Sequence, residues 1–97
     1  YAALLRQVRA FHGEQVPIIL MASKANEQMG LYVRAAGERS GVGNLHYCII
    51  NESAHNDTSD LGASWHPNYR GHRKIASILA PYVASVTGWD FPFKPFE

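Results

Sequence analysis

The sequence predicts an α/β fold in which helices cover a parallel sheet, with the element order α-β-α-β-loop-α. Three observations lead to this prediction. Two short apolar segments rich in β-branched residues, 16–21 and 45–50, are typical of buried parallel strands. Amphipathic helical patterns lie before, between and after them. Strands that alternate with helices in this way favour parallel βαβ connections.

The first element is a helix predicted over residues 1–12. Its apolar stripe consists of Tyr1, Leu4, Leu5, Val8 and Phe11. Gly13 is a suitable stop signal for this helix. The strand over 16–21 follows, and Pro17 near its start removes a ladder donor where the loss does least harm.

A second helix is expected over about 25–38 because apolar side chains recur there at helical spacing. They are Met29, Tyr32, Val33 and Ala36. Ser23 is expected either to cap this helix or to lie in the turn before it. The glycine-containing segment 41–44 breaks the helix and leads into the strand over 45–50.

A polar loop over 51–67 connects that strand to the last helix, and loops of this length are usually functional. The last helix is predicted over about 68–86. Its apolar stripe consists of Ile75, Ile78, Leu79, Tyr82, Val83 and Val86. Pro81 is expected to kink or divide this helix, and Gly88 to end it. The tail, 89–97, holds four aromatic residues and two prolines and is expected to pack over a surface in extended form.

Composition bounds the class of protein. The 97 residues allow one small domain, and 46% hydrophobic residues, 18% charged residues and a net charge of +1 are typical of a globular chain. This charge argues against a nucleic-acid or anionic-membrane partner. The only basic cluster, Arg70, Arg73 and Lys74, is interpreted as a solvated first helical turn. No apolar run approaches a membrane span, and no signal peptide is visible. Cys48 lies in an apolar run and is expected to pack in a strand rather than react.

The two predicted strands are apolar on both faces, and a sheet of two such strands leaves open edges. We therefore expect further strands elsewhere, in an N-terminal segment of the same polypeptide or in a second chain. The start at Tyr1, inside a helical pattern, leads to the same expectation.

The run from Asp60 to His72 contains the candidate catalytic and substrate-binding residues. Within it, Ser64-Trp65-His66-Pro67 comes just before the last helix, so His66 would be presented beyond the carboxyl end of a strand, where open parallel sheets bind ligands. The run resembles the last motif block of the SGNH (GDSL) hydrolases. It is most similar to carbohydrate esterase family 2, in which a Trp-His-Pro run and a downstream Gly-His are expected.

This resemblance covers residues 16–89 as architecture and is specific over 60–72. It implies that 1–97 is the C-terminal part of a flavodoxin-like three-layer α/β/α sandwich. It also implies a serine esterase that removes acetyl groups from a polysaccharide, with His66 as general base and then general acid. Trp65 would bind the substrate. The resemblance implies no metal or organic cofactor and an extracellular setting.

The chain departs from the family pattern in two places. Ala63 stands where most members carry an aspartate, so Asp60, Asp57 or Glu52 could orient His66 instead, Asp60 being the nearest. A backbone carbonyl could also do so, as in members that work with a Ser-His dyad. No Gly-Asp-Ser or Gly-x-Ser-x-Gly block occurs, so the nucleophile and the oxyanion donors are expected on an upstream segment or a partner chain.

Several other interpretations remain. Neither Ser23 nor Ser64 has the surroundings of a nucleophile, and the run 55–57 is better explained as a turn than as an oxyanion block. A zinc site from His55, His66 and His72 lacks suitable spacing. An SGNH lipase or lysophospholipase is the alternative enzyme, and a non-catalytic α/β interaction module is the alternative outside enzymes.

Overall fold

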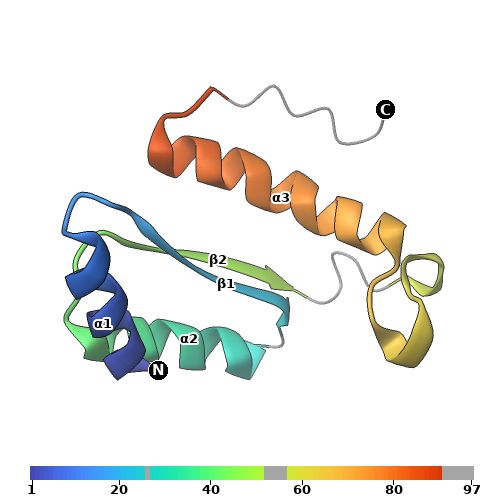
Figure 1. The fold of residues 1–97 in the computed structure, drawn as a ribbon. Coiled ribbons are helices and arrows are strands. Elements are labelled where there is room, and N and C mark those ends of the chain that lie inside the picture. The colour runs from blue at the N-terminus through green and yellow to red at the C-terminus, as the bar shows by residue number, and fades with distance from the viewer. Residues whose placement is uncertain (26, 52–56, 91–97) are drawn as a thin grey trace.

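The computed structural model describes residues 1–25, 27–51 and 57–90 (Figure 1). Their elements in chain order are α1 (Ala2–His12), β1 (Ile18–Ala25), α2 (Glu27–Ser40), β2 (Leu45–Asn51), the short 3-10 turns η2 (Thr58–Asp60) and η3 (Ala63–Trp65), and α3 (Tyr69–Thr87). This order confirms the predicted α/β class and the sequence of its elements.

The two strands pair in parallel, as predicted. Ile19 lies opposite His46 and Met21 opposite Cys48, and the register becomes irregular between Ala22 and Ala25. Within the described part of the chain the sheet has two strands. A sheet this small establishes a mixed α/β fold with a parallel sheet and nothing finer.

The helices form layers on both sides of the sheet. Figure 1 shows α1 and α2 below the strands and α3 above them, and the contacts of these elements agree. On the α3 side, Cys48, Ile50 and Ile75 are buried together, and Ile19, Leu79 and Tyr82 pack against them. Apolar burial of this kind supplies most of the stability of a packed helix.

On the other side, glycines bring α2 close to β2. A Cβ on Gly37 would lie 2.8 Å from two ring carbons of Tyr47, and one on Gly30 would lie 3.2 Å from the Ile49 side chain. A larger residue at either position would have to displace the Tyr47 or Ile49 side chain or move the helix away from the sheet. This contact depends on residue size, which an amphipathic pattern does not reveal.

The helix ends follow the predicted signals. Gly13 and Gly88 end α1 and α3 at positive φ values of 83° and 73°. Of the two outcomes expected for Pro81, a kink or a division of the helix, the division does not occur, because α3 continues to Thr87. A proline removes one backbone donor from the helix, and α3 tolerates this loss at Pro81.

The prediction for Ser23 was wrong. Ser23 lies inside β1 as an exposed strand residue, and α2 begins four residues later, at Glu27. Pairing between Ala25 and Asn51 prolongs β1 beyond the predicted end at residue 21. This long-range pairing outweighs the local preference of serine for a helix cap.

Cys48 is buried in the sheet, and this burial raises the pKa of its thiol. The packing role predicted for Cys48 is confirmed. None of the described helices is both long and apolar enough to cross a membrane. The tail residues 91–97, for which an extended surface segment was predicted, lie outside the described residues.

Candidate functional site

The segment 57–68 folds back on itself just before α3. The amide of Gly62 donates to the carbonyl of His66 over 2.7 Å, and the amide of Asn68 donates to the carbonyl of Asp60 over 2.8 Å. Leu61 and Pro67 form an antiparallel bridge between these two bonds. Figure 1 shows this loop on the side toward which β2 points, which is the side expected for a ligand site in a parallel sheet.

Asn68 joins the loop to the helix. Its side-chain oxygen caps α3 by accepting a hydrogen bond from the Gly71 amide over 3.0 Å. Its side-chain nitrogen donates to the carbonyls of Ser59, over 2.9 Å, and Leu61, over 3.3 Å. The start of α3 and the loop therefore form one hydrogen-bonded unit.

A buried ion cluster of Asp60, Arg70 and Lys74 also joins the loop to the start of α3. Asp60 is 0% exposed, and its Oδ2 accepts a hydrogen bond from Lys74 Nζ over 2.5 Å. Arg70 Nε lies 3.2 Å from Oδ1, an ion pair without the alignment of a hydrogen bond. Burying a carboxylate is costly unless it is paired, so Lys74 and Arg70 make this loop conformation possible.

Gly71 allows the helix to lie directly on the loop. A Cβ at this position would be 2.5 Å from the carbonyl oxygen of Asp60 and 2.9 Å from Cβ of Pro67. The neighbour that Gly71 allows α3 to approach closely is the loop that carries His66.

His66 sits at the end of η3, and its side chain is exposed. Its amide donates to the carbonyl of Ala63 over 3.1 Å, and its own carbonyl is held by Gly62, so its backbone is fixed on both sides. Among the described residues its imidazole makes no hydrogen bond, which leaves both ring nitrogens available for a reactant.

The two residues that precede His66, Ser64 and Trp65, have an unusual backbone conformation. Their φ values are 54° and 62°, which is the left-handed region that residues with a side chain adopt only at an energetic cost. Backbone strain of this kind concentrates at functional sites. The Trp65 side chain, next to His66 in the chain, is 74% exposed.

The carboxylates of Asp60 and Asp57 bind residues other than His66. The Asp60 carboxylate faces Lys74 and Arg70, and no hydrogen bond joins it to His66. Asp57 Oδ1 accepts hydrogen bonds from the amide and the hydroxyl of Ser59, both over 2.9 Å. Glu52 lies outside the described residues. The role of Asp60 as orienting acid stays a prediction, and the structure assigns this residue a second role as the anchor of the loop.

The interpretation of the basic cluster was wrong in part. Arg70 and Lys74 do not merely extend into solvent but hold Asp60. Together with Tyr69 and Arg73 they line a pocket of about 540 Å³ at the start of α3. The spacing of Arg70 and Lys74 places both on one helical face, but the sequence carries no signal that Asp60 would lie beneath them.

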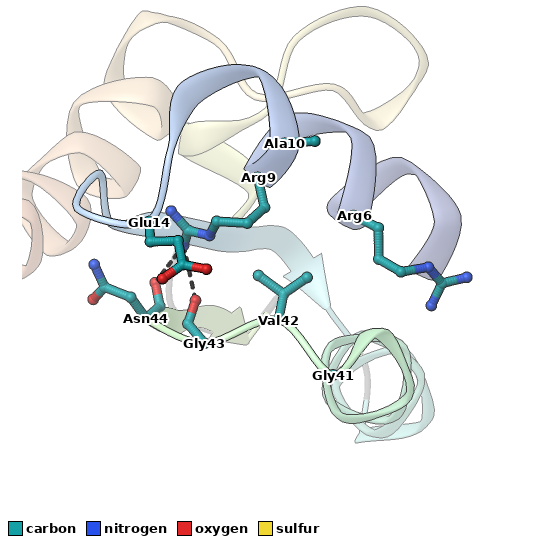
Figure 2. A pocket seen from close by; sticks show the side chains of 8 residues that line it. All are labelled: Arg6, Arg9, Ala10, Glu14, Gly41, Val42, Gly43 and Asn44. Atoms are coloured by element: carbon teal, nitrogen blue, oxygen red, sulfur yellow. Dashed lines mark hydrogen bonds between the residues drawn. The ribbon is translucent and has the colours of Figure 1, made fainter.

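A second hollow lies at the opposite end of the sheet, between α1 and the α2–β2 loop (Figure 2). It measures about 410 Å³ and is dominated by Arg9. The Arg9 guanidinium donates to the carbonyls of Gly13, Val16, Gly43 and Asn44 over 2.7, 2.5, 2.8 and 3.4 Å. Because these carbonyls occupy its donors, we interpret Arg9 as a structural clamp.

Within the described ranges, no three His, Cys, Asp or Glu side chains are close enough to hold a metal ion, and His55 lies outside those ranges. No protein-family model, curated protein or solved structure matches this chain. The chemistry of the loop 57–68 and of the start of α3 is therefore the basis for a function.

Proposed function

We propose that this chain supplies the general base and the substrate wall of a serine esterase that removes acetyl groups from hydroxyls of a polysaccharide. The complete esterase domain would be an SGNH-type, flavodoxin-like α/β/α sandwich, and residues 1–97 would form its C-terminal part. The observation that carries it is the exposed His66 imidazole, held by a rigid backbone beside exposed Trp65.

In this reaction His66 takes the proton of a serine hydroxyl as the oxygen attacks the ester carbonyl. It then gives the proton to the departing sugar hydroxyl, which leaves an acetyl group on the serine. Water, deprotonated by the same imidazole, hydrolyses that acyl-enzyme and releases acetate. The Trp65 ring would stack on the sugar and hold the ester over His66.

The nucleophile would come from a further segment or a second chain bearing a Gly-Asp-Ser block. An exposed apolar surface supports the existence of such a partner. A pocket of about 390 Å³ lies beside β1 and α2, where Met21, Met29 and Tyr32 are exposed. Contiguous apolar surface of this kind marks a contact site, and strands that complete the sheet are the occupant we propose.

The test is an esterase assay on the polypeptide or complex that contains both this chain and the Gly-Asp-Ser block. Hydrolysis of 4-nitrophenyl acetate and release of acetate from acetylated xylan are measured for wild type and His66→Ala. We expect His66→Ala to lower kcat by at least ~10³-fold, because the base takes part in both steps. A fluorophosphonate label should mark the serine of the wild type and react far more slowly with the variant.

His72→Ala is the matched control, since His72 is an exposed histidine on the first turns of α3. It should retain activity close to that of the wild type. Equal activity of His66→Ala and wild type would refute the proposal. A preference for a long-chain ester over the acetyl ester would favour the lipase alternative, and a folded assembly without any esterase activity would favour the interaction module.

A further inference from the structure

We propose that the free edge of β1 is paired with one further strand, which runs parallel to β1 and belongs to the polypeptide upstream of α1. This inference deepens the proposed function and rests on it, because it names the segment that completes the sheet and the edge at which it binds. Within the described residues, the two-stranded sheet has one free edge along each strand. Side-chain exposure and chain topology both select the edge of β1.

Neighbouring side chains of the two strands differ in exposure. Met21 lies opposite Cys48 in the parallel register, so both side chains point to the same face of the sheet. Cys48 is 5% exposed and packs with Ile75 of α3, whereas Met21 is 38% exposed. The cover that α3 provides therefore ends over β2, and this face of the sheet is open from β1 outward.

The apolar pocket of about 390 Å³ lies at the same edge. It is lined by one face of α2, by Tyr1 at the start of α1 and by Met21, Ala22 and Ser23 of β1, and by no described residue of β2. The helix α1 packs chiefly against α2 (Figure 1), and its side chains Tyr1 and Leu4 are 61% and 53% exposed. A strand beside β1 would place α1 under the sheet in the way that α2 already lies under β1 and β2.

The chain topology gives the position of the added strand. The connection from β1 to β2 passes through α2 below the sheet, and α1 lies on that same side before β1 (Figure 1). Connections between parallel strands are right-handed in nearly all proteins, so two connections on one side carry the chain in one direction across the sheet. A parallel strand that precedes α1 therefore lies beyond β1, on the edge away from β2.

The edge of β1 lacks the features that keep a free edge unpaired. Natural edge strands usually carry charged side chains or prolines that prevent further pairing. Residues 18–22, the regularly paired part of β1, contain neither. The unpaired backbone groups of such an edge bind another extended segment through main-chain hydrogen bonds. Since a strand inside a parallel sheet is buried on both faces, the added segment should be apolar throughout.

The parallel direction connects the added strand with the proposed reaction. Its carboxyl end would lie at the same end of the sheet as that of β2, and Figure 1 shows the loop 57–68 on that side. Loops that leave the carboxyl ends of parallel strands contribute to one ligand site. A residue that follows the added strand would enter the same region as His66.

Amide hydrogen exchange of the complete polypeptide, resolved by residue with NMR, tests the edge. In a strand at the edge of a sheet, alternate amides point outward and exchange rapidly, whereas a strand paired on both sides protects all of them. We expect the outward amides of residues 18–22 to exchange at least about 100-fold more slowly than the outward amides of β2. Nuclear Overhauser contacts between β1 and its new neighbour should have the pattern of parallel strands.

Thiol labelling of the native polypeptide tests whether the open face is covered. Met21→Cys should react with a maleimide at least about tenfold more slowly than Tyr69→Cys, because a covered thiol reacts only when the structure opens. Tyr69 is the matched control, since it is 76% exposed and lies in α3 on the other side of the sheet from α1 and α2. The wild type measures the background from Cys48, which is buried. Far-UV circular dichroism confirms that both variants are folded.

Three results would overturn the inference. The first is rapid exchange of the outward amides of β1, and the second is an antiparallel pattern of contacts at its edge. The third is protection of β1 that disappears on dilution together with a dimer in sedimentation, which would assign the edge to a second copy of the chain. Slow exchange along β1 at every protein concentration, with slow labelling of Met21→Cys, supports it.

Failure of this inference is distinguishable from failure of the proposed function. Esterase activity that depends on His66, in a polypeptide whose β1 edge exchanges rapidly, would refute only the inference. A protected β1 edge with a parallel neighbour, in a polypeptide without esterase activity, would refute only the proposed function.

Discussion

Lys74 Nζ lies 2.5 Å from Oδ2 of Asp60, a carboxylate that is completely buried between the loop 57–68 and α3. This pair joins the segment that carries His66 to the longest helix of the described chain. Since the Asp60 backbone also binds Asp57 and Asn68, a single residue connects both ends of the loop to the helix. The position of His66 therefore depends on a contact that lies beneath the surface.

Asp60→Asn should destabilise the protein strongly. The change leaves Lys74, which is mostly buried, without its counter-charge, and breaking such a pair costs about 3 kcal/mol of unfolding free energy. Urea denaturation measures this loss. Asp57→Asn is the control, because Asp57 is exposed and asparagine can also cap η2, so its midpoint should fall far less than that of Asp60→Asn. Equal midpoints for the two variants would show that the buried pair does not stabilise the fold.

Gly71→Ala changes stability through two opposing effects, a gain in helix propensity and a steric clash with the loop. Alanine in place of glycine inside a helix is favourable by about 1 kcal/mol. Here the new Cβ would lie 2.5 Å from the backbone oxygen of Asp60, which cannot move without displacing the loop. Overpacking of this kind costs about 1–3 kcal/mol, so we expect a net loss of stability in thermal or urea unfolding. Gly43→Ala, where the Cβ meets no atom within 4 Å, should change stability far less.

Arg9→Lys tests the clamp at the other end of the sheet. The Arg9 guanidinium reaches carbonyls of the α1–β1 connection and of the α2–β2 loop (Figure 2), whereas a lysine ammonium has no planar fork to span them. We expect a loss of about 1–2 kcal/mol of unfolding free energy. Arg39→Lys, at an exposed position on α2, should stay within about 0.5 kcal/mol of the wild type. Similar losses for both changes would contradict the role assigned to Arg9.

Asp57 should contribute a pH dependence to stability. Hydrogen bonds from the amide and then the hydroxyl of Ser59 lower the pKa of Asp57 below its ordinary value of 3.8. A lowered pKa in the folded state means that the contribution is present above pH 3.8 and is lost as the pH falls through the folded value. The urea midpoint of Asp57→Asn should therefore decline less than that of the wild type in this acidic range. Ser59→Ala, which removes only the hydroxyl donor, should give an intermediate result; identical pH profiles for all three proteins would refute the assignment.

The sequence by itself determined the α/β class, the order of the elements and the parallel pairing. These features follow from local periodicity and composition. The apolar segments around Leu20 and Cys48 have the length and pattern of buried strands, and Gly13 and Gly88 follow the last apolar positions of two helical patterns, where glycine commonly ends a helix. The exposed position of His66 after a turn and before a helix was also predictable, since Pro67 and Asn68 are local signals.

Only the tertiary structure decided where β1 ends, what covers Asp60 and how the basic side chains are arranged. Ser23 belongs to a strand because β2 offers a partner for the residues beyond it. Asp60 binds Lys74 and Arg70 because Gly71 lets α3 lie against the loop, and no local pattern encodes that approach. Periodicity reports which face of an element is buried, whereas the partner of a buried charge is set by residues distant in the sequence that folding brings together.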